Sequence, residues 1–237
     1  MVREGAESPG ELNARTDALV NGRVRVLTDT DNDGRYDEAV TFLDDLNFPT
    51  GIHPWRNGWI ITAAPDIIYA EDTDGDFKAD VQTVLFTGFT EGNQQHRVNG
   101  MRWGLDGWLY LANGDSGGEI KAVSRLGGEG SKNEMPKEPV NIRGRDIRIH
   151  PDTGAIETLS GQTQSGRNRD DFGNWFGNNN SNPIWHYVLE DRYLSRNPHA
   201  TGAQTKAQVA EVPGAAPVFP TSKTLARFND FHTANRF

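Results

Sequence analysis

Two short acidic loops carry the residue types best suited to metal binding in this sequence. Asp29–Asp37 reads DTDNDGRYD, and the pattern returns 43 positions later in Asp72–Asp80 as DTDGDFKAD. Each loop has Asp at its first, third, fifth and ninth positions, so four carboxylates lie within nine residues. Such a set is electrostatically costly unless a cation lies among the carboxylates, and hard oxygen ligands suit Ca²⁺.

We therefore predict one Ca²⁺ site in each loop. The predicted carboxylate ligands are Asp29, Asp31, Asp33 and Asp37 in the first loop, and Asp72, Asp74, Asp76 and Asp80 in the second. The main-chain carbonyls of Arg35 and Lys78 are expected to add one ligand each. The loops differ from EF-hands, because position 12 is Val40 or Thr83 instead of Glu and strand-like runs flank them. A structural role is therefore expected, and metal-free acidic surface turns are the alternative.

A second polar run, Gln94–Gly100, contains a histidine suited to proton transfer. It reads QQHRVNG and directly precedes an expected inner strand. Because imidazole exchanges protons near neutral pH, His96 is the candidate catalytic base. A histidine that only stabilises its own loop is the alternative. Asn99 follows in the same run, and Asp115 after the next strand is either a turn former or a site residue.

A third polar segment, Ser165–Asn182, occupies the corresponding position in the next repeat. Arg167 can bind a carboxylate through two parallel hydrogen bonds, and Asp171 lies nearby in the segment. An Asn-rich and Gly-rich loop that only supports its own turns is the alternative. Together with Asn99 and Asp115, Arg167 and Asp171 form the predicted cofactor-binding set.

The elements that must position these residues are short strands. Apolar runs flank both acidic loops and predict hairpins whose turns are the loops. Gly51–Thr62, two strands around an Asn-Gly turn, recurs at an offset of 49 residues as Gly100–Leu111. Offsets of 43 and 49 residues match one four-stranded blade, so the sequence predicts an all-β fold, a β-propeller of four-stranded antiparallel blades. We expect the tryptophans at similar repeat positions to pack between blades.

The expected strand starts define the domain organisation. The first complete blade has strands starting at Gly51, Trp59, Ile67 and Val81, the second begins near Val98, and a third begins near Arg169. About three of six blades are thus expected in an incomplete propeller. Residues 1–20 are predicted to be an N-terminal extension and 21–237 the partial propeller domain, with long loops at 114–140 and 200–223.

Composition narrows the function classes. The net charge of −9 argues against nucleic acid as a partner, and the absence of cysteine excludes disulfides and a c-type haem motif within these residues. No apolar run is long enough for a membrane span, and the N-terminus has no signal-peptide pattern. Low-affinity Ca²⁺ loops favour a periplasmic or extracellular location.

Several runs resemble the membrane-bound dehydrogenase domain of planctomycete-type bacteria, over roughly residues 20 to 237. The runs that carry the resemblance are Phe48–Gly51, Thr62–Ile67, Glu71–Asp76, Gly92–Gly100 and Tyr193–Pro198. That domain is a propeller often followed by helical repeats and a haem-binding Cys-x-x-Cys-His domain. The resemblance implies an oxidoreductase with a cytochrome c domain as partner, haem c lying only outside these residues.

More distantly, the chain is similar to the soluble quinoprotein glucose and sorbosone dehydrogenases, six-bladed propellers that use pyrroloquinoline quinone and Ca²⁺. In that superfamily a catalytic His lies four residues before a Gly that opens an inner strand ending in Asp-Gly-x-x-Tyr, which matches His96, Gly100 and Asp106–Tyr110. A Gly-x-Arg-Asn motif whose Arg contacts the quinone is partly matched by Ser165–Asn168. The quinone's own Ca²⁺ site has no counterpart here, because it would come from later blades.

The resemblance implies a quinoprotein-type dehydrogenase acting on a sugar or alcohol. His96 would take the hydroxyl proton, and Arg167 would help to hold the quinone. A secreted, non-catalytic propeller that recognises a glycan or a protein partner is the alternative.

Overall fold

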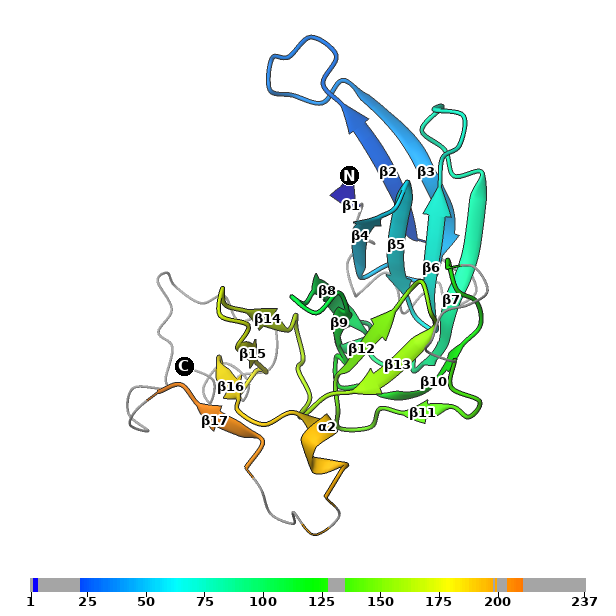
Figure 1. Ribbon diagram of the computed structural model, residues 1–237. Helices are drawn as coiled ribbons and strands as arrows, with labels where there is room; N and C mark the ends of the chain where they lie inside the picture. Colours follow the sequence, from blue (N-terminus) through cyan, green and yellow to red (C-terminus); the bar gives the residue numbers. More distant parts are fainter. Residues whose placement is uncertain (1, 4–21, 128–134, 198, 200–203, 211–237) are drawn as a thin grey trace, which may run out of the picture.

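The structure is a computed structural model that describes residues 2–3, 22–127, 135–197, 199 and 204–210. Their regular secondary structure is almost entirely β, in four antiparallel sheets (Figure 1). The exceptions are a 3₁₀ turn, η1 (Gln94–His96), and the one-turn helix α2 (Asp191–Leu194). No helix among the described residues has the length and apolar character needed to cross a membrane.

The four sheets follow one another along the chain. The N-terminal sheet has the order β1 (Val2–Arg3), β2 (Gly22–Thr28), β3 (Glu38–Leu46). The first blade comprises β4 (Gly51–Trp55), β5 (Gly58–Ala63), β6 (Asp66–Glu71) and β7 (Val81–Phe89), extended at its outer edge by β10 (Gly118–Ala122) and β11 (Val140–Asn141). The second blade comprises β8 (Asn99–Trp103), β9 (Leu109–Ala112), β12 (Ile147–His150) and β13 (Ala155–Thr158). The third comprises β14 (Asn168–Arg169), β15 (Trp175–Gly177), β16 (Trp185–Tyr187) and β17 (Lys206–Gln208).

The sheets pack face to face, and side-chain alternation along the strands explains why. Ile60 and Ile61 are both fully buried although they are neighbours on β5. Because successive side chains of a strand point to opposite faces, Ile60 enters the core against the second blade, whereas Ile61 enters the core against the N-terminal sheet. The first and second blades therefore each supply apolar residues to two cores, as neighbouring blades of a propeller do.

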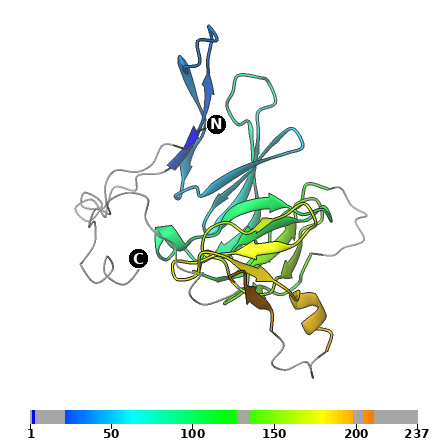
Figure 2. The ribbon, with the colours of Figure 1, turned by 90° about the vertical axis from the view of Figure 1, so that its left-hand side faces the viewer.

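The predicted fold class is confirmed. The four strands of the first blade begin within one residue of their predicted positions, and both acidic loops are the turns of hairpins, β2–β3 and β6–β7. The tryptophans pack between sheets as expected, with Trp59 in one interface, Trp55 and Trp103 in the next, and Trp108 in the last. Figure 2 shows the N-terminal hairpin projecting from one end of the sheet array.

Two segments predicted as loops contain strands. The prediction of a loop at 114–140 was wrong over Gly118–Ala122, because these residues form β10, which pairs with β7 and lengthens the first blade. The 200–223 loop was wrong over Lys206–Gln208, which forms the outer strand of the third blade; residues 211–223 lie outside the described part. Of the predicted extension at residues 1–20 only Val2 and Arg3 are described, and they pair with β2. A short polar strand such as β17 has no sequence period, so only its neighbour reveals it.

A buried ion pair joins the second and third blades. Asp146 and Arg167 are 0% and 1% exposed, and Arg167 Nη1 lies 3.2 Å from Asp146 Oδ2. The guanidinium also donates to the Ser160 carbonyl and lies 3.8 Å above the centre of the Tyr187 ring. Asp146 further accepts hydrogen bonds from the main chain of Asn113 and from both the main chain and hydroxyl of Thr163. Burial raises the pKa of Asp146, against the lowering effect of Arg167 and these donors.

We predict that Arg167→Met destabilises the protein by about 3–5 kcal/mol, because it leaves the Asp146 charge buried without its counter-ion. Denaturant unfolding monitored by tryptophan fluorescence measures the change. Adding Asp146→Asn to Arg167→Met should recover part of the loss, since the amide removes the charge and keeps an acceptor for Thr163. A loss below about 1 kcal/mol for Arg167→Met, or no recovery in the double variant, would contradict the role of the pair.

A glycine contact sets the distance between the inner strands of the same two blades. Gly100 on β8 has φ of +62°, and a Cβ built on it would lie 2.3 Å from the Cα of Gly166. We predict that Gly100→Ala costs at least about 1–2 kcal/mol, because it adds both left-handed strain and a main-chain clash. Gly107→Ala is the matched control, since Gly107 has φ of +78° but no atom within 4 Å of the added Cβ. Equal losses would show that backbone strain alone matters.

Candidate functional site

Each acidic loop brings three carboxylates together. Asp29, Asp31 and Asp37 offer oxygen atoms within 4.8 Å of one another, and Asp72, Asp74 and Asp80 do the same in the second loop. These residues are exposed or half-buried at the tips of the two hairpins. Carboxylate triads of this size can hold a metal ion.

Matching hydrogen bonds shape the two loops. In the first, Asp37 accepts from the main chain and hydroxyl of Thr30 at 2.9 and 2.8 Å; in the second, Asp80 accepts from the same two groups of Thr73 at 2.7 Å. These donors hold the pKa of Asp37 and of Asp80 below the ordinary value. Both carboxylates are therefore kept ionised, which is the form that binds a cation.

Two predicted ligands, the aspartates at the fifth position of each loop, are not part of the triads. Asp33 instead accepts a hydrogen bond from the main chain of Arg35, and Asp76 accepts from the main chain of Lys78. The Lys78 ammonium also lies 2.8 Å from Asp76. A turn-capping carboxylate and a predicted ligand look alike in sequence, because both favour Asp at alternate positions.

The second loop also contacts the neighbouring sheet. The main chain of Ala79 donates to the Phe42 carbonyl on β3 at 2.8 Å, and the Ala79 side chain packs into the core between the N-terminal sheet and the first blade. A cation bound in this loop would therefore order a contact between two sheets, as well as its own hairpin.

His96 lies at the opposite end of the sheets from the acidic loops. The inner strands β4, β8 and β14 all begin at this end, which we call the mouth, and the acidic loops join strands at the other end. Asn93 caps η1 by accepting from the main chain of Gln95, and the buried Arg97 fixes the turn by donating to the Glu91 carbonyl and to Asn47. His96 is thus presented at the mouth on an anchored turn, with 28% of its side chain exposed.

Two residues from other connections contact the imidazole, and a third contacts one of these two. His96 Nδ1 lies 3.4 Å from Asp115 Oδ2, and His96 Nε2 lies 3.4 Å from Gln164 Nε2. The amide of Gln162 donates to the other oxygen of Asp115. We call His96, Asp115, Gln162 and Gln164 the mouth site.

The geometry assigns the two imidazole nitrogens. If Nδ1 carries the proton beside the Asp115 carboxylate, the lone pair of Nε2 faces the Gln164 amide. The contact to Asp115, at 3.4 Å, is longer than a charge-assisted hydrogen bond of about 2.7–2.9 Å. An imidazole that lies beside a carboxylate in this way can act as a base.

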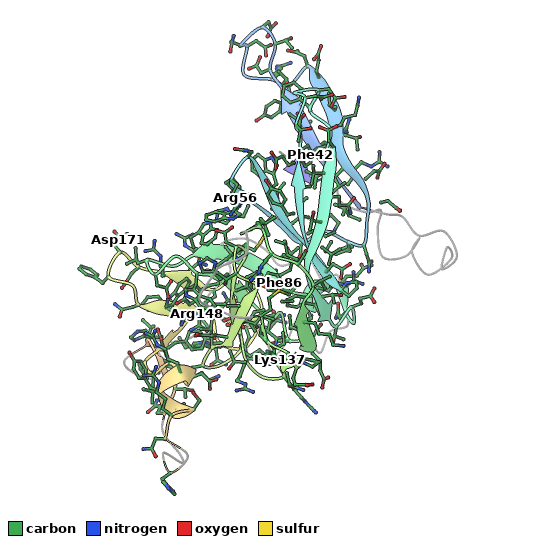
Figure 3. All side chains as sticks on the ribbon, turned by 45° about the vertical axis from the view of Figure 1, so that its right-hand side comes forward. Phe42, Arg56, Phe86, Lys137, Arg148 and Asp171 are labelled. Atoms are coloured by element: carbon green, nitrogen blue, oxygen red, sulfur yellow. The ribbon has the colours of Figure 1, made fainter. Side chains whose placement is uncertain are left out.

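The other predicted cofactor-binding residues lie elsewhere. Asn99 donates to the carbonyls of Arg97 and Gln164 and accepts from the main chain of Gly166, so it clamps the mouth connections together. The Arg167 side chain does not reach the mouth, because its guanidinium is buried in the ion pair between blades. Asp171 is exposed in the β14–β15 turn, at the end away from the mouth, and Figure 3 shows it at the periphery.

Sequence reasoning missed Gln162 and Gln164. Both lie in the connection that leads into β14, which corresponds to the connection containing Gln94, Gln95 and His96 before β8. The signal was therefore a Gln-containing run at the same point of two successive repeats. It could indicate the position of these residues, but not that their amides meet Asp115 and His96.

Comparison with known families gives one match. Residues 4–237 match the family described as a domain of unknown function, DUF7133. No curated protein matches the sequence. Because the match covers nearly the whole chain, the protein belongs to the DUF7133 family.

Proposed function

We propose that this domain binds Ca²⁺ in its two acidic loops and binds a hydroxyl-bearing small molecule, a sugar or an alcohol, at the mouth site. The observation that carries the second part is the contact of His96 with Asp115, which leaves Nε2 as the proton acceptor. A hydroxyl placed at Nε2 would displace the Gln164 amide, and Gln162 would keep the Asp115 carboxylate in place.

Ca²⁺ is the cation best matched to the loops. The ligands are carboxylates on irregular, exposed turns, and Ca²⁺ accepts flexible oxygen coordination, whereas Mg²⁺ demands near-ideal octahedral geometry. Loops of this openness bind weakly, in the range of extracellular Ca²⁺ modules. This supports the proposed periplasmic or extracellular location.

The described residues do not fit a quinone held by Arg167. The guanidinium is committed to Asp146 and to the Ser160 carbonyl, and a ligand could reach it only by separating the second and third blades. The proposed role of His96 is therefore limited to accepting a proton and includes no hydride transfer. For dehydrogenase activity, groups beyond these residues would have to bind a quinone. A cytochrome c domain would then have to accept electrons from that quinone. Without them the domain is a binding module for the same ligand.

For the loops, we predict that Ca²⁺ titrated calorimetrically into the chelated chain binds at two sites. Asp31→Asn and Asp74→Asn should each weaken one site at least tenfold, because each removes one carboxylate of a triad. Ca²⁺ at one hundred times the dissociation constant should raise the free energy of unfolding by about 2.7 kcal/mol for each occupied site. Asp171→Asn, an exposed carboxylate outside both loops, is the control. Absence of heat on Ca²⁺ addition, or equal effects of all three variants, would refute the loop sites.

Asp33→Asn provides a finer test of the ligand set. We expect it to weaken the first site less than Asp31→Asn does, because Asn can still accept the hydrogen bond from the Arg35 main chain. An equal or larger loss would show that Asp33 joins the triad when Ca²⁺ binds.

For the mouth, we predict that His96→Asn abolishes dye reduction by the chain supplied with Ca²⁺ and pyrroloquinoline quinone, if any sugar or alcohol supports it. A loss of about 10²–10⁴-fold in kcat is expected for a general base, with unchanged thermal unfolding. His199→Asn, at an exposed histidine, is the control. No reduction with any substrate would exclude dehydrogenase activity by this chain alone, and turnover unaffected by His96→Asn would remove His96 as the base.

A further inference from the structure

A polar cleft of about 490 Å³ lies beside the mouth site. Six side chains mark its walls: Thr90, Asp115, Glu119, Asn141, Arg143 and Gln162. The remaining lining is Ser116 and the main chain of three glycines. A volume of this size is typical of small-molecule sites, but this lining contains no aliphatic or aromatic side chain.

The strands β10 and β11 build the cleft. β10 pairs with the outer strand of the first blade, and Glu119 of β10 lies opposite Asn141 of β11. Main-chain hydrogen bonds from Thr90 to Gly117 and from Ile142 to Gly118 fix the walls at 3.1 and 3.0 Å. The cleft is therefore held by sheet pairing and by main-chain contacts, so its shape exists before a ligand arrives.

Asp115 belongs to both the cleft and the mouth site. Its side chain contacts His96 and Gln162, and its backbone has φ of +75°, a left-handed conformation that is unfavourable for a residue other than glycine. The surrounding structure maintains that conformation: Asn113 accepts from the main chain of Gly117, and Gly114 donates to Thr163. Strain of this kind is concentrated at binding sites. A ligand in the cleft would thus contact Asp115, the residue that lies beside the imidazole.

The lining places one cationic group among acceptors for hydroxyl groups. Asp115 and Glu119 supply carboxylate acceptors for hydroxyl groups, and Asn141 and Gln162 supply amides that donate and accept. Arg143 supplies a guanidinium that is exposed and has no acceptor among the residues that the structure describes, whereas the nearby Arg145 pairs with Asp191 at 3.2 Å. A guanidinium in that state binds a carboxylate through two parallel hydrogen bonds.

We infer that the cleft binds an acidic sugar of the hexuronate class, with its carboxylate on Arg143 and its hydroxyls on Asp115, Glu119 and Gln162. The inference rests on the proposed function, because it names the substrate class of the same mouth site. Arg143 is then the residue that determines specificity. The ring of the sugar occupies the cleft, whose lining includes Asp115 and Gln162 of the mouth site but not His96.

The test is calorimetric titration of D-galacturonate and, separately, D-galactose into the chain in the presence of Ca²⁺. Galacturonate should bind at least tenfold more tightly than galactose. Arg143→Gln should remove that preference and leave galactose binding unchanged, because the amide keeps hydrogen-bonding capacity without charge. Arg196→Gln, at an exposed arginine outside the cleft, should change neither affinity. Circular dichroism checks that each variant is folded.

Two further variants separate this inference from the proposed function. Ser116→Trp should abolish binding of both sugars by filling the cleft, whereas His96→Asn should keep the preference for galacturonate over galactose, because that preference depends on Arg143. If galacturonate does not bind, or if Arg143→Gln keeps the preference, the inference is wrong even where His96 proves to be a base. If binding follows Arg143 but His96→Asn has no effect on turnover, the cleft stands and the catalytic role of His96 fails.

Discussion

The arrangement of the mouth depends on one buried carboxylate, Asp146. It has no exposed surface, and its two oxygens accept hydrogen bonds from Asn113 of the second blade and from Thr163 and Arg167 of the third blade's approach. Asn113 precedes Asp115 by two residues, and Thr163 lies between Gln162 and Gln164. A buried carboxylate must have its acceptor capacity filled, so the cost of leaving it unpaired fixes both connections at once.

Arg167 shows why a family motif is not sufficient to place a residue in a site. The run around Arg167 resembles one in which the arginine contacts a quinone, and the residue does follow a connection that lines the mouth. Its guanidinium, however, turns inward, where Asp146 and the Tyr187 ring compensate for the loss of water. Burial, with the nearby Asp146 charge, raises the pKa of Tyr187 to about 12, so that the ring stays neutral beside the pair. At the mouth, Gln162 and Gln164 contact Asp115 and His96 instead. Their side chains carry no charge, so they need no counter-ion.

The two ends of the blades depend on different interactions. At the loop end, like charges gather at hairpin tips, and local hydrogen bonds such as that from Thr30 to Asp37 shape each loop within nine residues. At the mouth end, contacts join residues up to 68 positions apart, as between His96 and Gln164. The loop end therefore depends on its own sequence. The mouth depends on how neighbouring blades dock through the apolar faces of strands such as β5.

The sequence by itself determined what is local and periodic. The hairpins, the strand starts of the first blade and the acidic turns follow from alternation and turn chemistry, which act over a few residues. It also indicated His96, because the run that contains it precedes a recognisable inner strand. Only the tertiary structure decided the role of each polar side chain: that Arg167 is buried, that Asp171 lies at the far end, and that β10 and β11 form a cleft next to Asp115. These outcomes depend on packing between blades, where the partner of a charge is distant in sequence and leaves no periodic signal.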